Sequence, residues 1–372
     1  MKEKKALTQL QTILFIVVIC VAFVVGLLID RYILISPAAQ AESIVFTCWG
    51  GDFGDLTNNI AENFTRDYGN SVLLEYHAGA SSTVISKIEA TWPEVKIDLT
   101  SVAPSVAYQL AEAGYLAELT KEECPVLDQI PDNLLIKYDG KIYGVGIYVI
   151  PVISCAWRSD LISEPIANWT DLFKEGYSGK IATSYLPLGT GDSLMMSSYW
   201  FNGSEYDVEP GWEHLTELAP HIGGIWTTES ECINFMASGE RPICLCVTAD
   251  KLYQWYTQGV QVDWIPYFND TEKAFAVAVD CVVALDGPRQ QIAKHFINYY
   301  FSPKHNEYLT GNIGLLPSNK YAQINLDIAP FSPTSEQIEK YGKMFDIPWK
   351  AAHIDEWVTK WDEDIAPLIG TG

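Results

Sequence analysis

Positive charge is scarce in this chain of 372 residues, in which Lys and Arg number 24 against 47 Asp and Glu. The formal net charge is −23, and beyond the first five residues, MKEKK, the sequence holds no basic run. Nucleic-acid binding requires clustered Lys and Arg, which neutralise phosphates and release their counterions. The composition therefore argues against a nucleic-acid partner. We interpret the acidity as that of a soluble surface outside the cell.

The spacings of cysteine and histidine that mark metal sites are also absent. Cys20 lies in an apolar N-terminal segment, and seven more Cys are scattered at positions 48, 124, 155, 232, 244, 246 and 281. Cys244 and Cys246 share one face of an apolar strand-like run, which differs from a CxxC metal motif. Because seven is odd, at least one thiol is free or pairs between molecules. Structural thiols or one or two disulfides are favoured over a metal, and we expect no metal and no cofactor.

The strongest feature that is present is an apolar segment from Ile13 to Ile29, directly after the Lys cluster. At ~1.5 Å per residue it nearly spans a bilayer core. The Lys cluster should stay in the cytoplasm, which places the residues after Ser36 outside. Residues 39–41, Ala-Gln-Ala, have the form of a cleavage site, so a cleavable signal peptide is the alternative to a retained anchor. Either way we expect an extracytoplasmic protein, anchored to the plasma membrane or secreted.

Strand and helix patterns alternate along the rest of the chain, which shows no internal repeat and no low-complexity segment. Residues 43–49 read as a buried strand, and residues 55–69 carry apolar side chains every four positions, as one face of a helix does. Such repetition indicates βαβ units around a largely parallel sheet. Two long apolar β runs, 139–157 and 273–285, bracket a second region of this kind, and each can cross between two lobes.

The predicted fold class is therefore α/β, with two α/β lobes joined by two β crossovers around a ligand cleft. One N-terminal transmembrane helix or signal peptide precedes them. Ligands in open α/β sheets bind at the carboxyl ends of strands, so the loops after strands should face that cleft. We expect residues 1–41 to hold the Lys cluster and the anchor or signal segment, residues 42–147 with 281–332 to form lobe one, residues 148–280 to form lobe two with the crossovers, and residues 333–372 to form C-terminal helices that pack on lobe one.

Six motifs occur in a defined order: VFTCWGGDF, IDLTSVAPSVAYQLAEAGYLAEL, DGKIYGVGIYVIPVISCAWRSDLI, NWTDLFKEGYSGKIATS, VAVDCVVAL and GNIGLLPSN. Together they cover most of residues 43–319 and resemble the substrate-binding proteins of ABC importers. The resemblance is to the bilobal type II periplasmic class, which holds polyamine, iron and organophosphate receptors. It implies two hinged lobes, no chemistry of their own, and delivery of a small solute to a membrane permease with cytoplasmic ATPases.

Candidate ligand residues follow the strands of lobe one. Trp49 comes directly after the first strand, beside two glycines that let a ligand approach the backbone, and Asp52 shares its loop. Ser101 and Ser105 flank the end of the third strand, where a helix cap is the other role we consider. Asp280 interrupts the second apolar β run, and a charge buried there needs a partner, either a ligand or a structural salt bridge.

A second candidate is the loop Gly189, Thr190, Gly191 before a helix, with Asp192 or Ser193 as the cap. Free N–H groups and the positive end of the helix dipole meet at such a point and favour an anion, although a plain capped turn is the alternative. The resemblance supports the anion, because related receptors for phosphate-bearing ligands place a glycine loop there.

The letters G-D-S-L around Ser193 also mark the nucleophile of one hydrolase family, which makes a membrane-anchored ectohydrolase the rival function. A nucleophilic Ser needs a positioned His. That family places the motif near the start of its domain and a D-x-x-H near the end. Here the motif is in mid-chain, and none of the six His has an Asp three residues before it. We therefore expect no enzyme activity.

In lobe two, Tyr185, Trp226, Thr248 and Asp250 follow strands and offer further walls for a ligand, although core packing explains the aromatic ones nearly as well. The polyamine receptors hold an amine with an Asp at the position of Asp280. The chain departs from them by carrying an Ala where they have a Trp two residues earlier, and it lacks their acidic pair after GKIATS. We therefore rank a zwitterion or a phosphate- or phosphonate-bearing anion first, a polyamine such as spermidine or putrescine second, and then a ferric complex.

Overall fold

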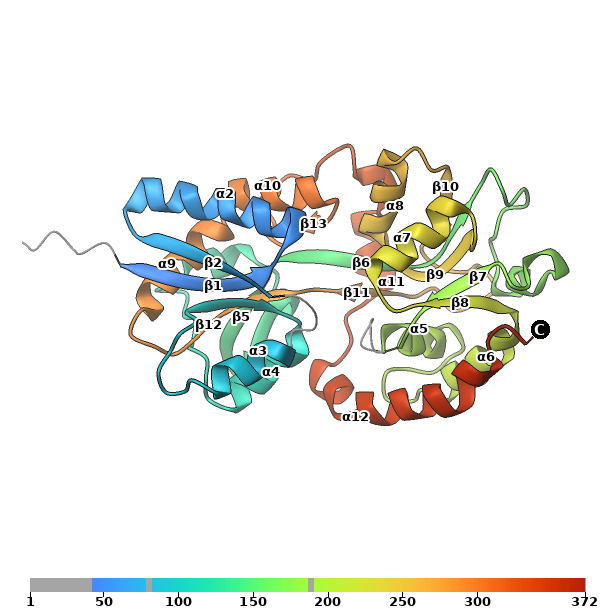
Figure 1. Ribbon diagram of the computed structural model, residues 1–372, viewed down its shortest axis with the longest axis horizontal. Coiled ribbons are helices and arrows are strands. Elements are labelled where there is room, and N and C mark those ends of the chain that lie inside the picture. Colours follow the sequence, from blue (N-terminus) through green and yellow to red (C-terminus); the bar gives the residue numbers. More distant parts are fainter. Residues whose placement is uncertain (1–41, 78–81, 187–190, 372) are drawn as a thin grey trace, which may run out of the picture.

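The computed structural model describes residues 42–77, 82–186 and 191–371, which form two α/β lobes lying side by side (Figure 1). The apolar segment that we expect to cross the membrane falls outside these residues. In the described part of the chain, no helix is both long and apolar enough to span a bilayer.

Lobe one is built on a six-stranded sheet with the order β2-β1-β3-β12-β5-β4. Strand β1 pairs in parallel with β2 and β3, whereas β12 is antiparallel to both β3 and β5. The carboxyl ends of β1, β2 and β3 therefore lie at the edge of the sheet where β12 begins. The strands are β1 (Ser43–Trp49), β2 (Ser71–His77), β3 (Leu99–Val102), β4 (Leu135–Tyr138), β5 (Lys141–Gly146) and β12 (Cys281–Ala284).

Helices cover both faces of this sheet because each has one apolar side. In α2, Ile60 and Phe64 lie four residues apart and are fully buried against Phe46 of β1, and Gly69 ends the helix in the left-handed region. A separate cluster, which includes Val106, packs on the other face. The helices of the lobe are α2 (Gly51–Tyr68), α3 (Ser82–Glu89), α4 (Pro104–Glu112), α9 (Gln290–Tyr300) and α10 (Pro303–Ile313).

Lobe two has an eight-stranded sheet whose main path is β14-β11-β6-β9-β7-β8, with β10 and β13 paired to β6. The sheet is mixed because β6, which enters from lobe one, runs antiparallel to β9 and to the returning strand β11, whereas β7 pairs in parallel with β8 and β9. The strands are β6 (Tyr148–Arg158), β7 (Ile181–Ser184), β8 (Ile222–Trp226), β9 (Ile243–Thr248), β10 (Val262–Ile265), β11 (Phe275–Ala278), β13 (Leu316–Pro317) and β14 (Gly342–Lys343).

Aromatic side chains fill the core of lobe two on both faces of its sheet. Trp169 and Trp200 lie in one buried cluster, and Trp226 and Trp255 lie in another. The helices around them are α5 (Asp192–Trp200), α6 (Glu209–Leu218), α7 (Glu229–Ser238), α8 (Ala249–Thr257), α11 (Ser335–Tyr341) and α12 (Ile347–Lys360).

Two stretches of chain join the lobes, as the sequence predicts. Strand β5 of lobe one continues through Ile147 into β6 of lobe two, and β11 of lobe two continues through Val279 and Asp280 into β12 of lobe one. The second apolar run is therefore two strands rather than one. It is interrupted at Val279 and Asp280, where the chain passes between the lobes.

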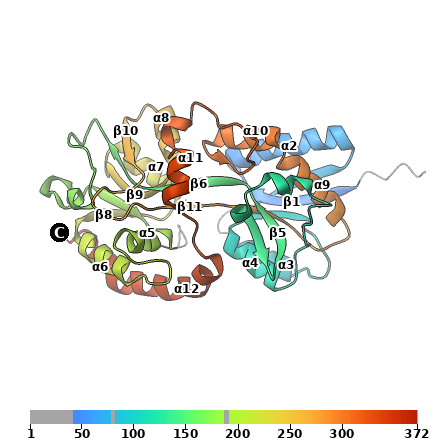
Figure 2. The ribbon, with the colours of Figure 1, turned by 180° about the vertical axis from the view of Figure 1, so that it is seen from behind.

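The C-terminal segment departs from the packing that we expected on lobe one. Trp357 and Trp361 are buried among Leu194 and Trp212 of lobe two, and β14 pairs with β11. Lobe one is contacted at the start of α12, where Ile347 packs beside α4. Seen from behind, α11 and the chain after it run along the junction of the lobes toward α12 (Figure 2). Segment 333–372 thus touches both lobes, and its large aromatic side chains bury against the second.

Candidate functional site

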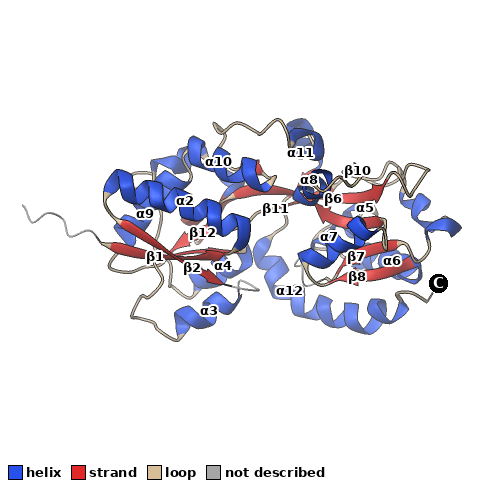
Figure 3. Cartoon of the chain, turned by 45° about the horizontal axis from the view of Figure 1, so that its top comes forward, coloured by secondary structure: helices blue, strands red, loops and turns tan. Residues whose placement is uncertain are grey.

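The carboxyl ends of the lobe-one strands meet the crossovers at one place (Figure 3). Trp49 at the end of β1 pairs in register with His77 at the end of β2. Cys281, the first residue of β12, pairs with Val102 at the end of β3. The backbone N–H of Ile147 donates to the carbonyl of Asp280 over 2.7 Å, so both crossovers start beside each other. The fold therefore brings Trp49 and Asp280 to the same edge of the sheet.

Aromatic rings form a continuous group at this edge. Trp49 lies 5.7 Å from Phe53 and 5.4 Å from His77, measured between ring centroids, and Phe53 lies 6.3 Å from Tyr148. All three contacts are edge-to-face, which suits the quadrupoles of the rings. The Nδ1 atom of His77 is buried and has no hydrogen-bond partner among the described residues. The group offers ring faces to a ligand.

Asp280 lies beside this aromatic group. The hydroxyl of Tyr148 donates a hydrogen bond of 2.7 Å to its Oδ2 atom. Burial raises the pKa of Asp280 to about 6, and the charge of Glu229 in lobe two contributes to the rise. Among the residues that the structure describes, no Lys or Arg forms an ion pair with it. The structural salt bridge that we considered for Asp280 is therefore not found in this part of the chain, and its carboxylate has no positive partner.

Charged residues of lobe two face the same point. Lys251 pairs with Glu229 and with Asp250, each at 2.6 Å, and only 9% of its side chain is exposed. Asp250 contributes to the raised pKa of Tyr148, which burial raises first, just as Glu229 acts on Asp280. Asp250 and Glu229 of lobe two therefore act electrostatically on the crossover residues Tyr148 and Asp280. Glu229, Asp250 and Asp280 supply three carboxylates, and Lys251 supplies one ammonium group. The electrostatic potential at this point therefore favours a cation.

Of the glycine loop, only Gly191 lies within the described residues. Gly189 and Thr190 lie outside the described residues, whereas Gly191 precedes α5 with φ +86° and without a side-chain cap from Asp192 or Ser193. A Cβ atom on Gly191 would come within 3.1 Å of the ring of Trp357. Asp192 forms an ion pair with Lys350 of the C-terminal segment, and both side chains are largely buried. Helix α12 therefore packs against the start of α5 through Trp357 and Lys350, and the anion seat at this loop stays a prediction.

Ser193 gains no support as a nucleophile. Its side chain is buried, with 3% exposure, and its Oγ atom has no hydrogen-bond partner in the described part of the chain. A serine nucleophile requires a base within hydrogen-bond reach. The rival function as an ectohydrolase therefore has no structural basis in these residues.

The remaining candidates divide between core and surface. Trp226 is in the buried core of lobe two, and the hydroxyl of Tyr185 donates to Asp362 of the C-terminal segment at 3.3 Å. Asp52 is exposed in the first turn of α2.

Ser101 and Ser105 do not cap α4, whose cap residue is Ala103 and has no side-chain cap bond. Ser101 is fully buried within β3, where its carbonyl contacts His77 Nε2 at 3.3 Å.

Thr248 of lobe two is better placed. It ends β9 opposite Val152 of β6, close to the crossovers, and Asp250 follows it in the first turn of α8.

The sequence reasoning missed His77, Tyr148, Glu229 and Lys251. His77 had a usable signal, because it ends the second predicted strand as Trp49 ends the first.

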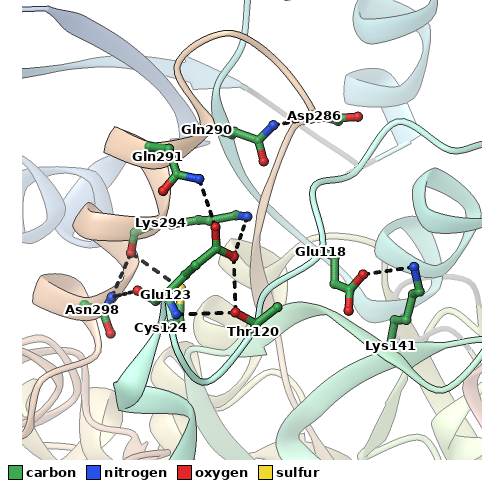
Figure 4. A network of polar contacts seen from close by, with 10 residues as sticks. All are labelled: Glu118, Thr120, Glu123, Cys124, Lys141, Asp286, Gln290, Gln291, Lys294 and Asn298. Carbon is green, nitrogen blue, oxygen red and sulfur yellow. Dashed lines mark hydrogen bonds and ion pairs between the residues drawn. The ribbon is translucent and has the colours of Figure 1, made fainter.

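A hollow of about 390 Å³ lies elsewhere on lobe one, near the far end of β12. Its charged groups are already paired: Glu123 accepts from Lys294 at 2.8 Å and from Gln291 at 2.9 Å, and Lys141 pairs with Glu118 at 2.9 Å (Figure 4). A charged ligand would have to displace these partners. The unpaired Asp280 therefore makes the junction of the lobes the stronger candidate.

Solved structures of transport proteins share this fold. An ABC transporter protein from Clostridium perfringens matches with a TM-score of 0.72 and 19% identity, over 87% of this chain and 99% of that one. The spermidine/putrescine substrate-binding protein PotD from Streptococcus pneumoniae matches at 0.69 and 16%, over 87% and 100%. The periplasmic binding protein AfuA from Actinobacillus pleuropneumoniae, with fructose-6-phosphate bound, matches at 0.66 and 16%, over 88% and 99%.

A search of curated proteins returns no match. The model of one protein family, however, covers residues 59–345, which include both crossovers, Asp280 and most of the two lobes. The family resemblance suggested by the six sequence motifs is thereby confirmed. The chain has two α/β lobes whose strands end at the junction between them, and the match over residues 59–345 shows that it belongs to the bacterial extracellular solute-binding protein family.

Proposed function

We propose that the chain is the receptor of an ABC importer for a small solute that carries a protonated amine. The solute binds at the junction of the lobes, and the receptor delivers it to a membrane permease driven by cytoplasmic ATPases. One observation carries the choice of ligand: Asp280 is a desolvated carboxylate beside aromatic rings, without a positive partner among the described residues. An ammonium group supplies the missing charge, and ring faces attract cations.

Electrostatics support an amine over a phosphate. Glu229, Asp250 and Asp280 outnumber Lys251 at the junction, so a phosphate would meet net negative charge. At the start of α5, the expected anion seat, α12 packs through Trp357 and pairs Lys350 with Asp192. The sequence ranked a zwitterion or a phosphate- or phosphonate-bearing anion first and a polyamine second, so the proposal keeps the zwitterion and places the phosphate below the amines. Polyamines and amino-acid-like zwitterions share the amine and remain the two sources to separate.

The arrangement also supports closure of the lobes on the ligand. Trp49 belongs to lobe one, Glu229 and Lys251 to lobe two, and Asp280 to the chain between them. A ligand that contacts all of these gains its full binding energy only when the lobes approach each other. The closed state is then the form that the permease receives.

Calorimetric titration tests the proposal with four probes: spermidine, putrescine, γ-aminobutyrate and a sugar phosphate. Binding of at least one amine at pH 7.5, lost on Asp280→Asn, is the expected result. Asp55→Asn, at an exposed position of α2 in lobe one, is the matched control and should keep full affinity. Tight binding of the sugar phosphate without amine binding would overturn the choice of ligand, while leaving the receptor function in place.

The N-terminal segment completes the proposal. Membership of an extracellular family places the folded region outside the cytoplasm. We further propose that residues 13–29 remain as a membrane anchor, because this apolar run exceeds the ~7–15 residues usual for a signal peptide. The anchor would hold the receptor close to its permease.

A further inference from the structure

The first crossover is held from lobe one by two buried polar side chains. At Ile147, between β5 and β6, the backbone carbonyl accepts from Nδ2 of Asn306 at 2.7 Å and from the hydroxyl of Ser318 at 3.0 Å. Asn306 is on α10, and Ser318 directly follows β13. Asn306 is fully buried, and Ser318 is nearly so. Two side chains of lobe one therefore bind a single carbonyl of the crossover, away from solvent.

The amide of Asn306 is bonded at both ends in only one orientation. Its Oδ1 atom accepts from the backbone N–H of Asn319 at 2.9 Å, while its Nδ2 atom donates to the carbonyl of Ile147. A carbonyl requires a donor and an N–H requires an acceptor, so a flipped amide would lose both bonds. Asn319 is held in turn, because its Nδ2 atom donates to the carbonyl of Phe301 at 2.8 Å. A buried network whose members are bonded in this way holds its geometry rigidly.

Ile147 connects this network to the Asp280 carboxylate. The backbone N–H of Ile147 donates to the carbonyl of Asp280 over 2.7 Å. The next residue, Tyr148, donates from its hydroxyl to Oδ2 of Asp280 and pairs in register with Pro317 of β13. The carbonyl of Ile147 is therefore bonded to lobe one, and its N–H is bonded to the second crossover.

We propose that Asn306 is a positioning residue for ligand binding, which acts through Ile147 to hold the Tyr148 hydroxyl on the Asp280 carboxylate. Ser318 supports the same contact. This inference rests on the proposed function, because it takes Asp280 as the group that binds the ligand. It also gives a role to the end of the motif GNIGLLPSN, whose last two residues, Ser318 and Asn319, belong to the network.

The length of the Tyr148 side chain explains why such an anchor matters. A hydrogen bond weakens steeply as its distance and angle depart from the optimum. The hydroxyl of Tyr148 is at the far end of a rigid ring, so a small rotation of the backbone displaces it from Asp280. Fixing the preceding residue, Ile147, prevents that rotation. The carboxylate then keeps its orientation before the ligand arrives, and less ordering is needed on binding.

Asn298 of α9 is a matched control in the same lobe. Its Oδ1 atom accepts from the backbone N–H of Val126 at 3.1 Å, and its Nδ2 atom donates to the carbonyl of Glu123 at 2.8 Å (Figure 4). Asn298 therefore joins a helix to a neighbouring segment as Asn306 does. The segment that it holds is the 3-10 turn Pro125–Gln129 rather than a crossover. Replacing either Asn removes bonds of the same kind, but only one of them reaches Asp280.

Carbon-13 NMR of the free, full-length receptor tests the proposal without a ligand. The carboxyl signal that disappears in Asp280→Asn reports the ionisation of Asp280, whose pKa is about 6. Asn306→Ala should raise this midpoint by roughly half a pH unit or more, as should Tyr148→Phe, because a weaker hydrogen bond stabilises the ionised form less. Asn298→Ala should leave it at the wild-type value. An unchanged midpoint in Asn306→Ala would overturn the proposal.

The comparison isolates geometry, because Asn306→Ala and Asn298→Ala add and remove no charge. Both variants keep the titratable groups that surround Asp280 and its hydrogen-bond partner, namely Tyr148, Glu229, Asp250, Lys251, Cys281 and Tyr300.

Calorimetric titration with putrescine and γ-aminobutyrate measures the effect on binding. At pH 7, Asn306→Ala should lower amine affinity roughly three- to tenfold, as expected for a lost hydrogen bond, and Asn298→Ala should lower it less than about twofold. In a Tyr148→Phe background, Asn306→Ala should cost less than about twofold more, because both changes remove the same contact. Losses that multiply would show that Asn306 acts by another route and would overturn the proposal.

The two measurements also separate this proposal from the choice of ligand. A raised midpoint in Asn306→Ala without binding of either amine would reject the amine and keep the role of Asn306 at Asp280. Amine binding that is lost in Asp280→Asn but intact in Asn306→Ala, with an unchanged midpoint, would reject the positioning role alone. Ser318→Ala removes only one donor to Ile147 and should show the same pattern with smaller changes, so it decides the question if Asn306→Ala fails to fold.

Discussion

The hydroxyl of Tyr148 donates a hydrogen bond of 2.7 Å to Oδ2 of Asp280, and so joins the start of one crossover to the end of the other. It is the one hydrogen bond of the Asp280 side chain within the described residues, and it stabilises the ionised carboxylate against burial. Any ligand that binds Asp280 therefore meets a carboxylate whose orientation is already set.

Tyr148→Phe should weaken amine binding without removing the carboxylate. Loss of a hydrogen bond to a charged group, worth about 1.5–3 kcal/mol, raises the pKa of Asp280 further above its value of about 6. More of the receptor is then protonated at pH 7, and affinity should fall roughly tenfold. Titrations from pH 6 to 9 measure the change, and recovery of affinity at pH 9 distinguishes it from general damage to the site. Unchanged affinity at pH 7 would show that the ligand does not use the Asp280 charge.

Binding of the amine should depend on pH in a defined direction. Only ionised Asp280 pairs with an ammonium group, so affinity should decline by up to tenfold per unit as the pH falls below about 6. Calorimetry between pH 4.5 and 8 in buffers of different ionisation enthalpy also reports the protons released on binding. Asp280→Asn should bind weakly at every pH; a variant that keeps the wild-type slope would place the titrating group elsewhere.

The stability of the free receptor should change in the opposite direction. The pKa of Asp280 is about 6 in the folded protein and 3.8 in the unfolded chain. Between these values the native state holds a proton that the unfolded state has released. The proton on Asp280 therefore stabilises the folded state fully below pH ~4. This contribution to the free energy of unfolding, at most about 3 kcal/mol, is lost as the pH rises to ~6. Urea unfolding of the wild type and Asp280→Asn at pH 4 and 7 isolates this difference, which should shrink to zero if the carboxyl is not buried.

Gly191→Ala should destabilise the fold itself. Gly191 has φ +86°, and a Cβ atom there meets Trp357 at 3.1 Å. The left-handed conformation alone costs about 1–2 kcal/mol for an L side chain. Gly176→Ala is the matched control, because nothing lies within 4 Å of its Cβ position. The midpoints of urea unfolding of Gly191→Ala and Gly176→Ala, each compared with the wild type, measure the loss of stability. Equal stability of the two variants would mean that the loop can move away from α12.

Trp49→Ala should reduce amine affinity roughly three- to thirtyfold, the range of a cation–π contact. Trp226→Phe tests the core instead and should lower the thermal midpoint with affinity intact, since Trp226 is buried at 3% exposure. Small-angle scattering with and without ligand reports closure. A full affinity in Trp49→Ala would remove the aromatic group of lobe one from the site.

The sequence predicts those features that depend on local pattern. Trp49 is identifiable because it ends an apolar strand, and Asp280 because it is a charge in an apolar run. Their meeting follows from the order of strands, which the alternation of strands and helices indicates. Tyr148 could not be singled out in this way, because only the register of β5, β6 and β12 brings it to Asp280.

The C-terminal segment shows where local pattern is insufficient. Trp357, Trp361 and Ile365 are four residues apart, so the sequence indicates that this face of the segment is buried. Periodicity does not say which lobe covers it. That choice depends on the apolar surface offered by Leu194 and Trp212, and the same choice packs α12 against the start of α5.

The segment after α11 pairs with β11, touches α4 through Ile347 and then buries Trp357 in lobe two, so it adds a third contact between the lobes beside the two β crossovers. In a rigid-body rotation, every point moves in proportion to its distance from the axis. The two covalent crossovers and the contact at Ile347 therefore favour an axis that passes near all three. The start of α12 thus limits twist between the lobes and leaves bending as the easy direction of motion.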